Sequence, residues 1–200
     1  MNKEDILGYI IIILILFISY KIYRDSDIFQ LKCIVSTVDG DKYCVRERKD
    51  VQGASDLLAR ITEKMKLLVE YLDEKYPKES GKDNVRRLVQ KFNPKKIVET
   101  LPTSEYTAYS ENKGQKIAFC LNKKKEDNNH LIEENTLMFV ALHEMAHVAS
   151  KSIGHNTEFW DNFTFLIGEA EEIKIYTPID YSKKNEEYCG MTITSSPYFT

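Results

Sequence analysis

The feature that most constrains the fold is an apolar stretch around two histidines and a glutamate, Leu142-His143-Glu144-Met145-Ala146-His147. Residues 137–149 are apolar on almost every side of a helix, so a helix formed there must be buried. Buried polar side chains need partners. The chain must therefore fold around this helix and supply a partner for both imidazoles, which a metal ion does.

The spacing of these three polar residues is typical of a metal site on a helix. Positions i and i+4 share one face of a helix, so His143 and His147 can bind the same metal ion. Glu144 lies beside them and can reach a metal-bound water. Zinc lowers the pKa of that water to about 7, so a neighbouring carboxylate can take its proton and pass it to a departing amine. The motif predicts zinc ligands at His143 and His147 and a general base at Glu144.

A catalytic zinc usually has three protein ligands and one open position. His155 is the favoured third ligand, because Gly154 before it can adopt the left-handed conformation that ends a helix and turns the chain back. The alternative is an acidic residue on the following helix: Glu169, Glu171 or Glu172. The remaining histidine, His130, lies in a polar loop and is expected at the surface.

Beyond the motif, the chain continues Gly154-His155-Asn156-Thr157-Glu158-Phe159-Trp160. This arrangement resembles the WLM and SprT-like zinc metallopeptidases, with a third histidine after a turn and an aromatic pair about one helical turn later. The whole stretch, continued through residues 176–182 and 188–190, resembles metallopeptidases encoded by large DNA viruses still more. The resemblance implies a zincin fold, a Zn²⁺ cofactor and a protein or peptide substrate. The interval from His147 to His155 is two residues longer than in the WLM pattern.

The N-terminus carries a second constraint. Residues 6–20 are uncharged and rich in Ile and Leu, and extension to Tyr23 gives 18 residues, about 27 Å of helix. One alternative is a cleaved signal peptide, but no small-residue cleavage site follows the segment. The other alternative is a buried core helix. We predict a single-pass anchor at residues 6–23, with an anchor region 1–24 and a zincin-like domain 25–200. The flanking cations lean toward a cytoplasmic C-terminal domain.

The remaining chain alternates helical and strand patterns, which predicts a mixed α+β domain with a small antiparallel sheet packed on the active-site helix. Hairpins are expected at residues 31–45 and 105–121, helices at 54–72, 85–92, 131–152 and 157–173, a helical turn at 94–98, and a short alternating run at 191–194. The strand at 115–121 is a candidate edge for a peptide substrate. Phe159 and Trp160 are expected in the core, and Tyr181 or Tyr188 is a candidate oxyanion donor.

The four cysteines are widely spaced and include no CxxC pair. Cys33 and Cys44 flank the turn signal Asp39-Gly40. A four-residue loop at 37–40 would place them opposite each other, and a two-residue loop would not. Because cysteine usage is sparse, reduced and partly buried thiols are the favoured interpretation.

A net charge of -3 argues against a broad basic face for nucleic acid. Some WLM and SprT-like enzymes act on proteins crosslinked to DNA, but the acidic composition and the apolar N-terminus do not support that substrate here. The leading hypothesis is a membrane-anchored zinc metallopeptidase, most simply an endopeptidase. The alternative is a non-catalytic membrane or virion protein that keeps a zincin fold and a structural zinc.

Overall fold

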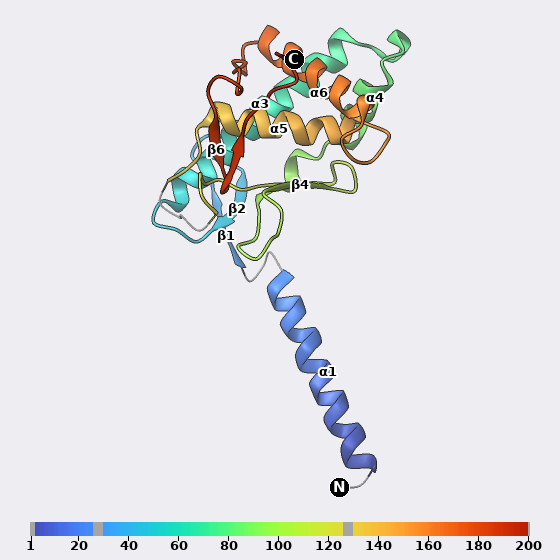
Figure 1. Cartoon of the computed structure of the whole chain (residues 1–200), viewed down its shortest axis with the longest axis vertical. Coiled ribbons are helices and arrows are strands. Elements are labelled where there is room, and N and C mark those ends of the chain that lie inside the picture. The colour runs from blue at the N-terminus through green and yellow to red at the C-terminus, as the bar shows by residue number, and fades with distance from the viewer. Residues whose placement is uncertain (1–2, 26–29, 126–129, 200) are drawn as a thin grey trace.

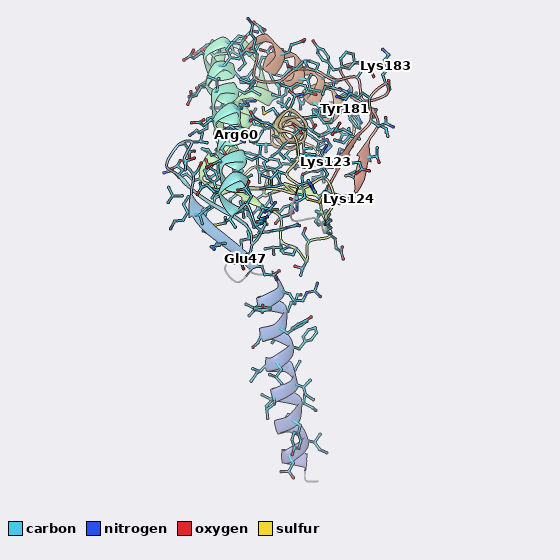
Figure 2. All side chains as sticks on the ribbon, turned by 90° about the vertical axis from the view of Figure 1, so that its left-hand side faces the viewer. Glu47, Arg60, Lys123, Lys124, Tyr181 and Lys183 are labelled. Carbon is cyan, nitrogen blue, oxygen red and sulfur yellow. A yellow bond between two sulfur atoms is a disulfide. The ribbon has the colours of Figure 1, made fainter. Side chains whose placement is uncertain are left out.

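The computed structural model describes residues 3–25, 30–125 and 130–199. Helix α1 (Lys3–Asp25) projects away from the rest of the chain (Figure 1). Its side chains stand out on all sides in Figure 2, and none of the apolar span Asp5–Arg24 is buried. The alternative of a buried core helix is therefore wrong. By length and composition the span could cross a membrane, which is weak evidence because signal sequences share these properties. The polar residues 24–30 predict a short linker, of which residues 26–29 lie outside the described residues.

Helix α5 (Glu134–Ala149), which carries the histidine motif, lies at the centre of the domain, as its apolar surface predicts. It contacts α3 (Val51–Lys75), α4 (Asp83–Lys91) and α6 (Thr157–Glu172). The helix begins three residues later than predicted, because Leu131 pairs with Asn122 and the Ile132 amide donates to the Leu121 carbonyl. These two residues extend the sheet region instead.

The central sheet has three strands in the order β3-β5-β4 and lies against α5. The strands are β3 (Ile97–Glu99), β4 (Ala108–Glu111) and β5 (Lys116–Phe119). The predicted antiparallel hairpin is confirmed for β4 and β5, but β3 pairs with β5 in parallel, so the prediction of an antiparallel sheet is wrong in part. The helical turn expected at 94–98 stops at the 3₁₀ turn Pro94–Lys96, because β-branched Ile97 is buried in a strand.

Two separate hairpins complete the fold, β1 (Leu31–Val35) with β2 (Lys42–Arg46), and β6 (Glu186–Tyr188) with β7 (Met191–Ile193). In the first, the Ser36 amide donates to the Asp41 carbonyl at 2.8 Å, which leaves the four-residue loop 37–40. In the second, the turn residues Cys189 and Gly190 have φ of 50° and 80°. Positive φ at both positions is the feature of a two-residue hairpin turn that matches strand twist.

All four cysteines form disulfides, so the prediction of reduced thiols is wrong. The β1–β2 register places Cys33 opposite Cys44, with their Cα atoms 3.9 Å apart. Cys120, just after β5, is bonded to Cys189 in the β6–β7 turn. The second bridge joins positions 69 residues apart, and no local pattern indicates it.

A buried ion pair fastens the first hairpin to the central sheet. Glu99 on β3 is fully buried, and its Oε2 accepts the Arg46 amide proton at 2.7 Å. Its Oε1 pairs with the Arg48 guanidinium, which is also buried. Burial of these charges is tolerated because they are paired and hydrogen-bonded to each other.

Candidate metal centre and substrate cleft

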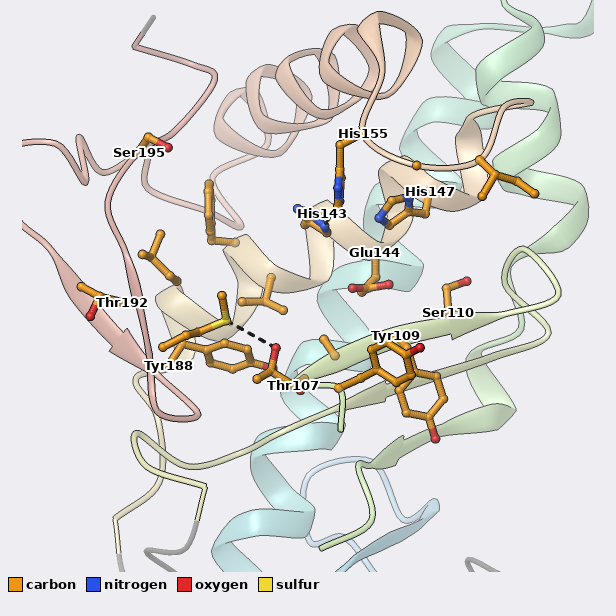
Figure 3. A pocket seen from close by; sticks show the side chains of 18 of the residues that line it. Thr107, Tyr109, Ser110, His143, Glu144, His147, His155, Tyr188, Thr192 and Ser195 are labelled. Carbon is orange, nitrogen blue, oxygen red and sulfur yellow. Dashed lines mark hydrogen bonds between the residues drawn. The ribbon is translucent and has the colours of Figure 1, made fainter. Parts of the chain in front are cut away.

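Three histidines converge at one point of the domain (Figure 3). His143 and His147 lie on the same face of α5, and His155 approaches them from the segment 150–156, which we term the ligand loop. One ring nitrogen from each lies within 4.8 Å of the others, and His143 Nε2 is 3.0 Å from His155 Nε2. Zinc–nitrogen bonds of about 2.1 Å hold ligand nitrogens roughly 3.4 Å apart, so this donor set fits a zinc ion.

The acidic residues considered as third ligands lie in other interactions. Glu169 accepts hydrogen bonds from Lys75 at 2.9 Å and from Tyr76 at 2.7 Å. Glu172 also pairs with Lys75, and Glu171 accepts a hydrogen bond from Tyr198. His130 is exposed, as predicted. The described structure therefore brings His155, and none of these acids, to the other two histidines.

The aromatic pair after the ligand loop packs under and beside the histidines. The Phe159 ring is buried and lies 4.8, 4.4 and 4.6 Å, between centroids, from the rings of His143, His147 and His155. Phe159 is thus in the core, as predicted. Trp160 is 43% exposed, so its prediction as a core residue is wrong. Its indole Nε1 donates to the His155 carbonyl at 3.0 Å and fixes the ligand loop.

Burial sets the protonation of the site. Burial, then the neighbouring rings of His147 and His155, lowers the pKa of His143 to about 3. Burial likewise lowers the pKa of His147 to about 4, so both imidazoles stay neutral at physiological pH and keep a lone pair for a metal. Glu144 is 4% exposed, and burial raises its pKa to about 8. A cation at the histidines would favour its carboxylate form.

Two cations complete the C-terminal end of α5. The ammonium of Lys113, in the β4–β5 turn, donates to the carbonyls of His147 at 3.2 Å, Ser150 at 3.0 Å and Ser152. Arg87 donates to the Ala149 carbonyl at 2.7 Å. Carbonyls at a helix end lack partners within the helix, and positive charge complements the helix dipole there.

The helix ends at Ala149, before the predicted limit of 152, because the backbone turns to an extended conformation at Ser150. Gly154 is left-handed with φ of 85°, as predicted, but it lies within the ligand loop.

Glu158 holds the same loop from the other side. Its carboxylate accepts hydrogen bonds from the hydroxyl and amide of Ser152 and from the Lys151 amide at 2.8 Å, and it pairs with Arg87 at 3.1 Å. The Ser152 hydroxyl and these amides lower the pKa of Glu158 to about 2. Its position in the first turn of α6 was a usable sequence signal for an acid. No sequence signal pointed to Lys113.

The histidines and Glu144 line a cleft of about 810 Å³ between α5, β4 and β7. The predicted edge strand, β5, is the central strand and cannot accept a peptide, so that prediction is wrong. The strand at the sheet edge beside the cleft is β4.

The tyrosines proposed as oxyanion donors do not present a hydroxyl to the histidines. The Tyr188 hydroxyl donates to the Thr107 carbonyl at 3.0 Å and accepts the Cys120 amide proton at 3.2 Å. Tyr181 is buried against Phe139 and is not among the residues that line the cleft. Both tyrosines therefore have packing roles in this structure.

Comparison with known proteins agrees with the sequence resemblance. Protein R325 of Acanthamoeba polyphaga mimivirus is 31% identical over 184 residues, which cover 92% of this chain and 90% of the relative. Protein 136R of Invertebrate iridescent virus 6 is 34% identical over 82 residues, covering 41% of this chain and 44% of the relative. Among solved structures, Wss1 from Saccharomyces cerevisiae has a TM-score of 0.47 and 21% identity, covering 64% of this chain and 84% of that one. The WLM domain model matches residues 46–197, so the chain belongs to the WLM domain family, which supports a metallopeptidase-type function in general.

Proposed function

We propose that this protein is a membrane-anchored zinc metallopeptidase that hydrolyses peptide bonds, with an anchor region 1–24 and a peptidase domain 25–200. The observation that carries the proposal is the convergence of three histidines and the Glu144 carboxyl group in one cleft beside a sheet edge. A structural zinc needs neither a carboxyl group beside it nor an open cleft.

In this proposal His143, His147 and His155 hold the metal. When bound, zinc supplies a Lewis acid that polarises the scissile carbonyl and acidifies a water. Glu144 would take a proton from the water that adds to the scissile carbonyl carbon and pass it to the amine nitrogen as the C–N bond breaks. The buried position of Glu144 strengthens its electrostatic interactions with the reacting groups. The backbone of β4 aligns the substrate as an added strand.

The test uses the full chain in detergent micelles, with zinc content and hydrolysis of an unfolded protein measured for each variant. We expect about one zinc per wild-type chain. Glu144→Gln is expected to keep the zinc and lose hydrolysis by at least about 10²-fold, the lower range of a general base. His155→Ala is expected to lose the zinc, whereas the exposed control His130→Ala keeps both properties.

Other outcomes would redirect the proposal. Zinc retained in His155→Ala would transfer the third ligand role to Glu169, Glu171 or Glu172. Stoichiometric zinc without hydrolysis of any unfolded protein would favour the structural alternative, a non-catalytic membrane or virion protein. Hydrolysis that is unchanged in Glu144→Gln would remove the assigned base.

For the anchor, we propose that α1 spans a membrane and that the domain lies on the side where disulfides form. The flanking cations favour a cytoplasmic domain, but their bias is small. Two disulfides are typical of an oxidising compartment and weigh more strongly. Protease protection of the full chain translated into microsomes tests this orientation. A domain digested by external protease would restore the cytoplasmic orientation.

A further inference from the structure

One end of the cleft has an apolar character that catalysis does not require. Phe139 and Val140 on α5 lie one helical turn before His143 and Glu144 and line the cleft. Met191 and Ile193 on β7, in the C-terminal part of the chain, line the same cleft. Met191 is 50% exposed, so its side chain is accessible to a ligand. A peptide lying along β4 past Glu144 would meet this wall next to the bond at the metal site.

The β6–β7 hairpin that forms this wall is fixed to the sheet region by several contacts. In its turn, the Cys189 amide donates to the Asn122 carbonyl at 2.9 Å and the Gly190 amide donates to the Lys123 carbonyl at 2.8 Å. The disulfide to Cys120 adds a covalent link at the same turn. A wall held in this way is already formed before a ligand binds, which lowers the entropic cost of binding.

The charged side chains of the cleft lie outside this apolar wall. Among the described residues that line it, Lys113 and Glu144 are the two Asp, Glu, Lys or Arg side chains. Lys113 follows the C-terminal end of β4 and is bonded to α5 and the ligand loop. The N-terminal end of β4 lies at the hairpin, where the Thr107 hydroxyl donates to Met191 Sδ at 3.5 Å. This end of the cleft therefore offers apolar surface and no charge.

We propose that the β6–β7 hairpin is the specificity element of the cleft, and that Met191 and Ile193 with Phe139 and Val140 take a large apolar side chain of the substrate next to the bond that is cut. This inference rests on the proposed peptidase function. A peptide that buries a Leu or Phe side chain here should bind at least about tenfold more tightly than a peptide with Asp at the same position. The Asp carboxylate would lose its water without gaining a partner.

The experiment measures binding separately from cleavage. The probes are short acetylated Gly/Ser peptides that carry a single Leu, Phe, Asp or Lys, titrated into the zinc-loaded, full-length Glu144→Gln protein in micelles. We expect the Leu and Phe peptides to bind at least about tenfold more tightly than the Asp peptide. Met191→Glu places a carboxylate in the wall and is expected to reverse the order of the Leu and Lys peptides. Glu187→Gln, an exposed change on β6 outside the cleft, is the matched control.

Cleavage of the same peptides by the wild-type chain separates the two ideas. A binding preference that follows Met191, without cleavage by the wild type, would support the specificity element and contradict the peptidase function. Equal binding of all four peptides, or a preference unaffected by Met191→Glu, would overturn the specificity element even in an active peptidase.

Discussion

Lys113 offers the sharpest test of how the three histidines of the proposed metal site are held in place. It lies in the β4–β5 turn, yet its ammonium reaches three carbonyls at the end of α5 and in the ligand loop. Lys113→Met keeps an unbranched apolar stem and removes the charge. The three carbonyls then lose their common donor, whereas Glu158, Trp160 and Asn162 still hold the ligand loop.

The magnitude follows from these contacts. A hydrogen bond to a charged group contributes about 1.5–3 kcal/mol, and a cation at a helix C-terminus contributes up to about 2 kcal/mol. These contributions do not add fully, because one ammonium makes all of them and because burial lowers the pKa of Lys113, a sign of its desolvation. We expect Lys113→Met to lower the free energy of unfolding by about 2–3 kcal/mol. Outer-shell partners of metal ligands affect affinity about 10- to 100-fold, so zinc should bind more weakly by that factor.

Urea unfolding of the full chain can be followed through Trp160, the sole tryptophan, whose ring lies 5.8 Å from that of His155. Zinc affinity is measured in parallel by competition with a chelator. Lys151→Met is the matched control, because it removes the same charge from an exposed position on the same loop. Equal effects of the two variants on zinc affinity would refute the positioning role of Lys113.

Three further predictions concern the frame around the site. Glu99→Gln should lower the free energy of unfolding, measured in urea, by about 3–5 kcal/mol, because it leaves buried arginines without their anion. Glu134→Gln, at a half-exposed ion pair, should lower it by less than about 1 kcal/mol. Similar losses in the two variants would contradict the role of the buried ion pair. The loop-entropy model gives the Cys120–Cys189 bridge about 4 kcal/mol and the bridge between positions 33 and 44 about 3 kcal/mol, so replacement of the longer-range pair by serines should lower the urea midpoint more. The pKa of Glu158, about 2 in the folded chain against an ordinary 4.5, implies a stabilisation that is complete above pH 4.5 and lost as pH falls toward 2. Glu158→Gln should flatten the curve of stability against pH between about pH 4.5 and 2. An unchanged curve in this range would argue against a role of Glu158 in holding the ligand loop.

Local sequence information was sufficient for the parts of the site that lie on one helix. The i, i+4 spacing placed His143 and His147 on one face, and the apolar surroundings predicted a buried α5. Gly154 indicated the turn that brings His155 back. Each inference depends on residues close together in the chain, where helical periodicity and backbone conformation determine geometry.

The predictions that failed concern contacts between residues far apart in the chain. The helical turn expected at 94–98 does begin at Pro94, with Asn93 as its cap, but the strand after it is defined by parallel pairing with β5, which local preference does not encode. The Cys120–Cys189 bridge and the contact of Lys113 with the His147 carbonyl span 69 and 34 residues. Such contacts follow from the tertiary fold, so a single sequence could not indicate them.

These long-range contacts have separable roles because they lie at opposite ends of β4. At the C-terminal end, Lys113 holds the ligand loop and therefore affects the position of His155. At the N-terminal end, the Cys120–Cys189 bridge and Tyr188 hold the β6–β7 hairpin and therefore affect the apolar wall. Both contacts contribute to stability, and the first also does so through the metal, because a metal that binds only the folded site stabilises the fold. Loss of the first should weaken zinc binding, whereas loss of the second should leave the histidines in place and reduce the preference for apolar side chains.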